Sequence, residues 1–125
     1  MIFGIGIDIV EIGRIQKSME KYAERFEGKL FTPEEIEFCR SRSNPVLHFA
    51  GRFAVKEAVL KCLGTGMTGG IGWKDLEVVS EPSGRPILRL HGKGKELFES
   101  LKLKAIHISI SHGQDYAVAQ ALAEK

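Results

Sequence analysis

The feature that most constrains the fold is the segment NPVLHFAGRFAVKEAVLKCLG, from Asn44 to Gly64, which is apolar around most of a helical circumference. Asn44 suits an N-cap, Pro45 suits the first helical position because no amide donor is needed there, and Gly64 is a typical stop. At 1.5 Å per residue this helix would be about 28 Å long, enough to cross a small domain. A helix that is apolar nearly all round lies in a core, so we expect the rest of the chain to pack around it.

Charged residues interrupt this central helix on two sides. His48, Arg52 and Lys56 recur at a spacing of four, and we expect their stripe to face solvent. Glu57 and Lys61 fall on the other side, where an unpaired buried carboxylate would be costly. Two interpretations stay open: a structural ion pair between Glu57 and Lys61, worth only about 0.2–0.5 kcal/mol on a surface, or a site where Glu57 binds a cation.

The segment Ile2–Val10 is predicted to form a strand with one apolar face and one nearly bare face. The apolar face carries Phe3, Ile5, Ile7 and Ile9. The other face carries Gly4, Gly6 and Asp8, and glycine inside a strand often marks the close approach of a backbone or a ligand. Asp8 therefore projects from a cleared face, with a strand-end aspartate that caps a helix as the structural alternative. An apolar strand and an apolar helix in so small a chain must share a core.

A basic stripe follows the strand. We expect residues 11–27 to form one amphipathic helix, because apolar residues recur there at spacings of three and four. Its basic residues recur in the same way: Arg14, Lys17, Lys21 and Arg25. Such a stripe is usually a solvated charged face. The sharper interpretation is a docking edge for an acidic partner helix, since complementary charge steers association.

The remaining segments predict short helices and antiparallel strands. Thr32 and Glu35 form a capping box at the start of a short helix, and a further helix is expected at 94–103. Strands are expected at 73–80, 86–90, 105–112 and 116–123. Strands that precede and follow the helices without regular alternation predict an α+β fold, with an antiparallel sheet packed on the central helix.

The stretch from Gly64 to Trp73 contains a literal G-x-G-x-x-G pattern. The dinucleotide fingerprint must follow a strand and open a helix, whereas this pattern follows a helix. We interpret it as a glycine-rich loop whose amides could approach phosphates, or as a simple connection.

Composition narrows the class of protein. A chain of 125 residues suits a single domain over residues 1–125, and a net charge of +2 is too small to indicate nucleic-acid binding. No apolar run approaches the roughly 20 residues of a membrane helix. Cys39 and Cys62 belong to no CxxC pair. We therefore expect a cytoplasmic protein with neither a membrane segment nor a nucleic-acid partner.

Metal-assisted phosphoryl-group chemistry is the function that these residues favour. Asp8 and Glu57 offer hard oxygen ligands that suit Mg²⁺, which keeps several waters and binds substrate phosphates. Lys61, one helical turn after Glu57, would neutralise phosphate charge, and Arg52 and His112 would add anion contacts.

Three other functions were weighed against it. A hydrolase built on Ser111 and His112 is disfavoured, because adjacent strand residues point to opposite faces. A glycosidase-type carboxylate pair lacks the aromatic platforms that sugar binding usually needs. A non-catalytic module that docks an acidic helix on the basic stripe would need no charged Asp8 or Glu57.

Several motifs, in order, carry a resemblance to a known family. They are GIDIVEI from Gly6 to Ile12, FAGRFAVKEAVLKCLGTG from Phe49 to Gly66, WKDLEV from Trp73, SGRP ending at Pro86, and SISH ending at His112. The chain resembles the holo-[acyl-carrier-protein] synthases, the small bacterial type of 4′-phosphopantetheinyl transferase. The resemblance implies transfer of phosphopantetheine from coenzyme A to a serine hydroxyl of apo acyl carrier protein, with adenosine 3′,5′-bisphosphate leaving.

The resemblance also implies roles for individual residues. Asp8 and Glu57 match the family's Mg²⁺ ligands and, with Lys61, its catalytic residues. The general base stays open between Glu57 and a water that Asp8 holds on the metal. Coenzyme A would be bound by Arg52, Lys61, Gly64, Pro86 and His112. The helix that docks the carrier protein would present Arg14, Lys17, Lys21 and Arg25. The family is typically a homotrimer with active sites between neighbouring subunits.

Overall fold

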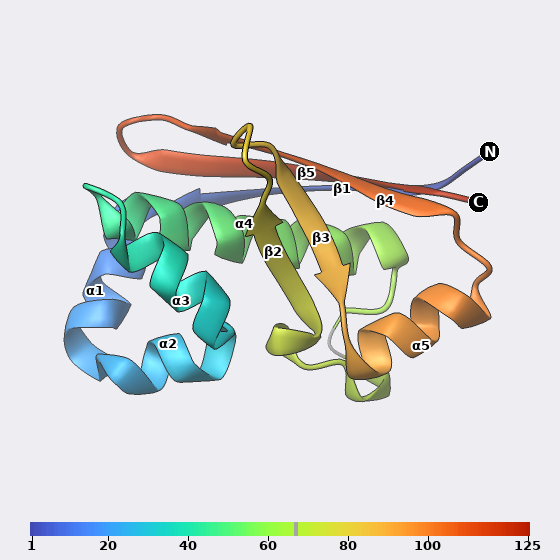
Figure 1. Cartoon of the computed structure of the whole chain (residues 1–125), viewed down its shortest axis with the longest axis horizontal. Helices are drawn as coiled ribbons and strands as arrows, with labels where there is room; N and C mark the ends of the chain where they lie inside the picture. Colours follow the sequence, from blue (N-terminus) through green and yellow to red (C-terminus); the bar gives the residue numbers. More distant parts are fainter. Residues whose placement is uncertain (67) are drawn as a thin grey trace.

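The computed structural model describes residues 1–66 and 68–125, and it confirms the α+β fold (Figure 1). Met67, in the glycine-rich loop expected from the sequence, lies outside the described residues. The first half of the chain forms β1 (Ile2–Glu11), α1 (Ile12–Tyr22), α2 (Glu24–Leu30), α3 (Pro33–Arg40) and α4 (Pro45–Leu63). The second half forms 3₁₀ turns at Thr68–Gly70 and Trp73–Asp75, then β2 (Leu76–Ser80), β3 (Pro86–Leu90), α5 (Gly92–Ser100), β4 (Ala105–His112) and β5 (Tyr116–Glu124).

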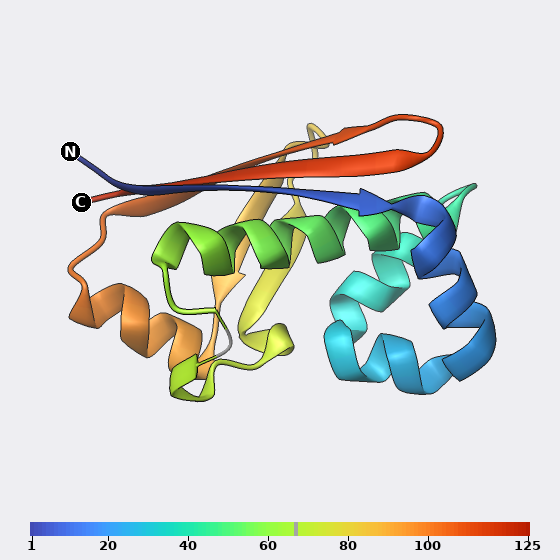
Figure 2. The same cartoon turned by 180° about the vertical axis from the view of Figure 1, so that it is seen from behind.

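The elements are arranged around α4, the central helix. An antiparallel sheet in the order β1-β5-β4 lies along one side of α4, and the antiparallel pair β2-β3 crosses it on another side (Figures 1 and 2). Helices α1, α2 and α3 gather at the N-terminal end of α4, whereas α5 lies near its C-terminal end. None of the described helices combines the length and hydrophobicity needed to cross a bilayer.

β1 lies unusually close to α4 because glycine removes the side chains at the contact. A Cβ at Gly6 would lie 2.0 Å from the carbonyl oxygen of Ala58, and a Cβ at Gly4 would lie 2.2 Å from that of Cys62. The predicted close approach is thus confirmed, and the approaching backbone is that of α4. The apolar face of β1 points the other way, where Ile5, Ile7 and Ile9 are 60%, 61% and 62% exposed.

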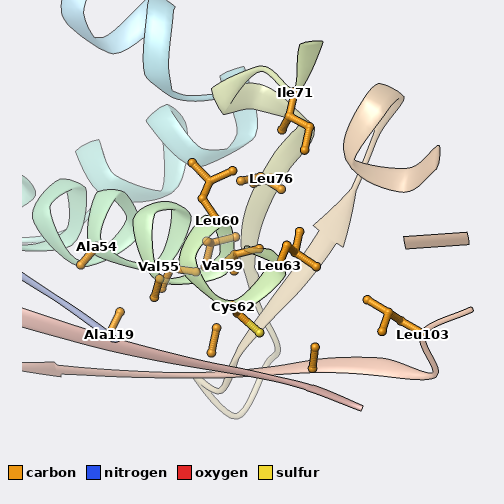
Figure 3. Packing of buried hydrophobic residues seen from close by; sticks show 14 residues of the cluster. Ala54, Val55, Val59, Leu60, Cys62, Leu63, Ile71, Leu76, Leu103 and Ala119 are labelled. Atoms are coloured by element: carbon orange, nitrogen blue, oxygen red, sulfur yellow. The ribbon is translucent and has the colours of Figure 1, made fainter. Parts of the chain in front are cut away.

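The main hydrophobic core is built on the C-terminal half of α4. Val55 and Val59 are fully buried, and Leu76 of β2 belongs to the same cluster and lies beside Leu60 (Figure 3). The sheet lies close to the helix because β5 presents small side chains to it: Ala117, Ala119, Ala121 and Ala123. These alanines made the strand hard to predict, yet they are what lets two backbones approach.

The expectation that the His48, Arg52 and Lys56 stripe faces solvent is wrong. Arg52 is 4% exposed and Lys56 is 0% exposed, because α3 and β2 cover that side of α4. The Lys56 ammonium donates to Glu35 Oε1 at 2.8 Å and to two backbone carbonyls. A buried ion pair is tolerable when its remaining hydrogen-bonding groups are also satisfied, as they are here.

Three boundaries also differ from the prediction. The expected helix over residues 11–27 breaks at Ala23, whose φ of 50° and ψ of −129° lie outside helical geometry, so Arg25 belongs to α2. The break turns α2 back so that Leu30 joins the same buried cluster as Ile15. The strand expected at 73–80 begins at Leu76, after a 3₁₀ turn, and the helix expected at 94–103 spans Gly92–Ser100.

The predicted start and stop signals of the helices are largely confirmed. Thr32 and Glu35 form the capping box of α3, and Gly64 ends α4 in the left-handed conformation at a φ of 75°. Asn44 occupies the N-cap position of α4, but its side chain makes no capping hydrogen bond.

Candidate active site

Asp8 and Glu57, the two predicted metal ligands, line the same cavity of about 440 Å³, which we call the carboxylate cavity. Asp8 comes from β1 and Glu57 from α4, and the glycine contact between these two elements brings them together. Arg14 of α1 and Phe53 of α4 form other parts of the wall. A strand and a helix that carry two separate sequence motifs therefore converge on one site.

Lys61 lies beside this cavity, but its partner is Asp8. Its ammonium donates to Asp8 Oδ1 at 3.0 Å and to the Ile7 carbonyl oxygen at 3.1 Å. The Asp8 side chain is 15% exposed and the Lys61 side chain is 55% exposed, so the ammonium remains open to solvent on one side. Within the described residues, the Glu57 carboxylate has no ion pair or hydrogen bond. The internal pair of Glu57 with Lys61 that spacing allowed does not form.

The electrostatics of Glu57 set it apart from an ordinary surface carboxylate. Burial raises the pKa of Glu57, the negative charge of Asp8 raises it further, and the Lys61 ammonium opposes both. Two carboxylates held close enough to repel each other favour a cation between them.

This donor set fits Mg²⁺. In the described part of the chain, no group of three or more His, Cys, Asp or Glu residues forms a complete metal cage. Mg²⁺ is usually bound by one or two carboxylates together with waters and substrate phosphates, and two carboxylates are what Asp8 and Glu57 offer.

The other predicted coenzyme A residues lie elsewhere. Arg52, Pro86 and His112 line a separate cavity of about 470 Å³, which we call the cationic cavity. Among the described residues, it shares no lining residue with the carboxylate cavity. Arg42 and His48 also line it, and neither was among the predicted site residues. Arg42 sits in a polar joint with no periodic pattern, so no local signal marks it.

Arg52 is held firmly inside the cationic cavity. Its guanidinium carbon lies 4.1 Å from the Phe38 ring centre, and its Nη2 donates to Ser80 Oγ at 3.1 Å. Its Nε is buried and has no hydrogen-bond partner among the described residues. A buried donor without a partner is rare in proteins.

Gly64 lies near the carboxylate cavity. With Glu57, Lys61 and Trp73 it lines a third cavity of about 510 Å³ that adjoins the first through Glu57. One face of the protein therefore carries Asp8, Glu57, Lys61 and Gly64, and another carries the cationic cavity.

The basic stripe is exposed but divided between two helices. Arg14, Lys17 and Lys21 lie on α1, and Arg14 reaches the carboxylate cavity. Arg25 lies on α2 and lines a neighbouring cavity of about 420 Å³. Lys29, which the sequence analysis did not include, lines the same cavity and extends the basic surface.

The chain is similar to known proteins over nearly its whole length. A sequence profile described as the 4′-phosphopantetheinyl transferase superfamily matches residues 4–121. The holo-[acyl-carrier-protein] synthase of Koribacter versatilis (strain Ellin345) is 48% identical over 124 residues, covering 99% of each protein. The Neisseria meningitidis holo-[acyl-carrier-protein] synthase structure has a TM-score of 0.93 at 33% identity, with 100% of both chains covered.

A second solved structure bears on the ligand. The Helicobacter pylori holo-[acyl-carrier-protein] synthase, in complex with coenzyme A, has a TM-score of 0.85 at 31% identity, covering 96% of this chain and 99% of that one. The resemblance found in the sequence motifs is thus confirmed over nearly the whole chain. The chain belongs to the 4′-phosphopantetheinyl transferase superfamily and, within it, to the holo-[acyl-carrier-protein] synthases.

Proposed function

We infer that this protein transfers the 4′-phosphopantetheine group of coenzyme A to a serine hydroxyl of apo acyl carrier protein and releases adenosine 3′,5′-bisphosphate. The observation that carries the assignment is the convergence of Asp8, Glu57 and Lys61 at one cavity, in a chain of this family. The serine oxygen bonds to the pantetheine-side phosphorus of the pyrophosphate. The phosphorus–oxygen bond to the adenosine-side phosphate breaks, and the serine proton passes to a base.

Asp8 and Glu57 would hold Mg²⁺, which when bound offsets the pyrophosphate charge and the charge that develops on the leaving group. Lys61 orients Asp8 through its hydrogen bond and can turn its solvent-facing side to a phosphate oxygen. The proton acceptor stays open between Glu57 and a water that Asp8 would hold, because bound Mg²⁺ would lower the Glu57 pKa that burial and Asp8 raise.

The basic stripe docks the acidic carrier protein. Arg14 supports this role because it lies both on the stripe and in the wall of the carboxylate cavity. A carrier bound along Arg14, Lys17 and Lys21 would therefore place its serine next to Asp8 and Glu57. Arg25 extends the same surface onto α2.

The complete active site combines two copies of the chain in a homotrimer. In the part of the chain that the structure describes, the carboxylate cavity and the cationic cavity have no residue in common. Coenzyme A, however, carries a pyrophosphate and a separate phosphomonoester that both need cationic partners. A head-to-tail contact joins two different faces, and such contacts close into rings. The exposed Ile5, Ile7 and Ile9 on β1 supply an apolar surface for the contact.

We also assign the protein to the cytoplasm. Cys39 and Cys62 are both buried and free, which agrees with a reducing compartment.

The test is the intact mass of an apo acyl carrier protein after incubation with this protein, coenzyme A and Mg²⁺. We expect a gain of one phosphopantetheine group, and no gain with a chelator or with folded Asp8→Ala or Glu57→Ala variants. Carrier binding without any mass gain would instead favour the non-catalytic docking module. Transfer that survives both substitutions would show that the metal site is wrongly placed.

A further inference from the structure

The cationic cavity contains a pair of histidines that no step of the transfer reaction uses. His48 of α4 and His112 of β4 meet edge to face, with ring centroids 5.8 Å apart. His112 can lie this close to α4 because Gly51 has no side chain, and a Cβ there would lie 2.7 Å from His112 Nε2. Phe38 of α3 packs against the other side of His48, at 5.8 Å between ring centroids.

The charges that face this pair are almost all positive. Arg52 comes from α4, Arg42 follows α3, and both line the cavity together with the two histidines. The turn between β2 and β3 contributes Glu81, the one carboxylate in the lining among the described residues. The elements packed around the pair therefore present two guanidinium groups and a single carboxylate.

This arrangement keeps the histidines neutral until an anion arrives. Burial is the largest cause that lowers the pKa of both rings, and the charge of Arg52 lowers both further. His112 adds to the effect on His48, as does Arg42. Arg52 itself lines this cavity, so its positive charge favours an anionic ligand there.

We propose that His48 is a further coenzyme A-binding residue of this protein, and that the His48–His112 pair takes up a proton when a phosphomonoester enters the cationic cavity. The proposal rests on the proposed function, which makes coenzyme A the ligand. A phosphomonoester is largely a dianion above its second pKa of about 6, and it cancels the positive field that kept the rings neutral. The rings are adjacent, so the charge of one opposes protonation of the other and the two titrate as a coupled pair.

The consequence is a pH-dependent affinity. The complex binds more protons than the free protein, so coenzyme A binding weakens as the pH rises through the pKa of the complex. Uptake of half a proton corresponds to a dissociation constant that rises about threefold per pH unit, and uptake of a whole proton to about tenfold.

Isothermal titration calorimetry of the assembled protein tests this directly. Coenzyme A is titrated at pH 7.5, with Mg²⁺ present, in two buffers that differ in ionisation enthalpy. The difference in observed heat gives the number of protons taken up. We expect uptake of about half to one proton, because the pair then gains charge while the ligand is already ionised.

The controls separate the pair from other sources of protons. The ligand 3′-dephospho-coenzyme A lacks the phosphomonoester and should give almost no uptake. His48→Gln and His112→Gln should each reduce uptake by at least half, whereas His107→Gln should not. His107 is a matched control because it lies on the same strand as His112 and pairs with Glu124 outside the cavity.

The possible outcomes distinguish failure of the proton-uptake inference from failure of the proposed transferase function. Coenzyme A that binds without proton uptake, or equal uptake by the wild type and His48→Gln, overturns the inference and leaves the transferase intact. Coenzyme A that does not bind at all overturns the proposed function instead. A His48→Gln variant that does not fold leaves His112→Gln to decide, since equal uptake there also refutes the pair.

Discussion

Replacing Gly6 with alanine should force β1 away from α4. The added Cβ would lie 2.0 Å from the Ala58 carbonyl oxygen and 2.7 Å from the Cys62 amide nitrogen. Carbon–oxygen contacts between backbones are ordinarily about 3.3–3.6 Å, so the strand must move by more than about 1 Å. Both opposing atoms belong to the helix backbone, so no side chain can rotate away to relieve the clash.

The magnitude follows from this geometry. Overpacking a well-packed core costs about 1–3 kcal/mol, and a clash between two backbones belongs at the upper end. For 125 residues, an unfolding entropy of about 2.1 cal/mol/K per residue turns about 3 kcal/mol into a fall in Tm of about 11 °C. Asp8 shares the strand face with Gly6, so it moves as well, and a 1 Å misplacement at an active site can cost about 10²-fold in rate.

The assay is thermal unfolding together with the transfer rate measured well below the Tm of the variant. Gly28→Ala is the matched control, because a Cβ at Gly28 in α2 meets nothing within 4 Å. That change should stabilise the helix by about 0.5–1 kcal/mol and leave transfer unchanged. A Gly6→Ala protein with the Tm and rate of the wild type would refute the close contact and the placement of Asp8 that depends on it.

Three further outcomes are expected. Burial and the Asp8 charge raise the pKa of Glu57 above 4.5, so the ionised form of Glu57 destabilises the fold as the pH rises. Glu57→Gln should therefore abolish transfer but raise the Tm at neutral pH in a chelating buffer. This gain in Tm should disappear below pH 4.5, where the wild-type carboxyl is protonated in both the folded and the unfolded protein. Reversing Lys17 and Lys21 to Glu should weaken carrier binding, measured by titration, while coenzyme A affinity is unchanged, and equal losses of both would indicate misfolding. The variants Asp8→Ala and Arg52→Met should each be inactive alone. When the two are mixed and reassembled, about a quarter of the wild-type rate should return, because a quarter of the sites in random rings combine an intact Asp8 from one copy with an intact Arg52 from its neighbour. No recovery on mixing would contradict sites shared between copies.

The features that the sequence predicted well are those that depend on local pattern. The central helix and its stop at Gly64 follow from composition and one left-handed residue, and the capping box at Thr32 is a four-residue signal. The bare face of β1 follows from Gly4 and Gly6, because only the absence of a side chain permits such a contact.

The features that it missed depend on partners distant in the chain. A helical wheel aligned Lys56 with His48 and Arg52 but could not say which side α3 and β2 would cover. Lys56 is buried because Glu35, far along the chain, reaches it with a carboxylate. For the same reason, helical spacing predicted Glu57 as a possible partner of Lys61. The actual partner of Lys61 is Asp8, which lies on β1 near the start of the chain.

The position of Arg52 relative to Lys61 supports the proposal that the site extends beyond one chain. They are nine residues apart, which at about 100° per residue places them on opposite sides of α4. A helix with its side chains is about 10 Å across, and the sheet and β2 also pack against it, so Arg52 and Lys61 face separate cavities of one copy. The family resemblance implies that both residues bind coenzyme A, and helical spacing places them on opposite sides of α4. The proposed homotrimer would bring both groups to one ligand, because a neighbouring copy would offer its cationic cavity to the carboxylate cavity of the first.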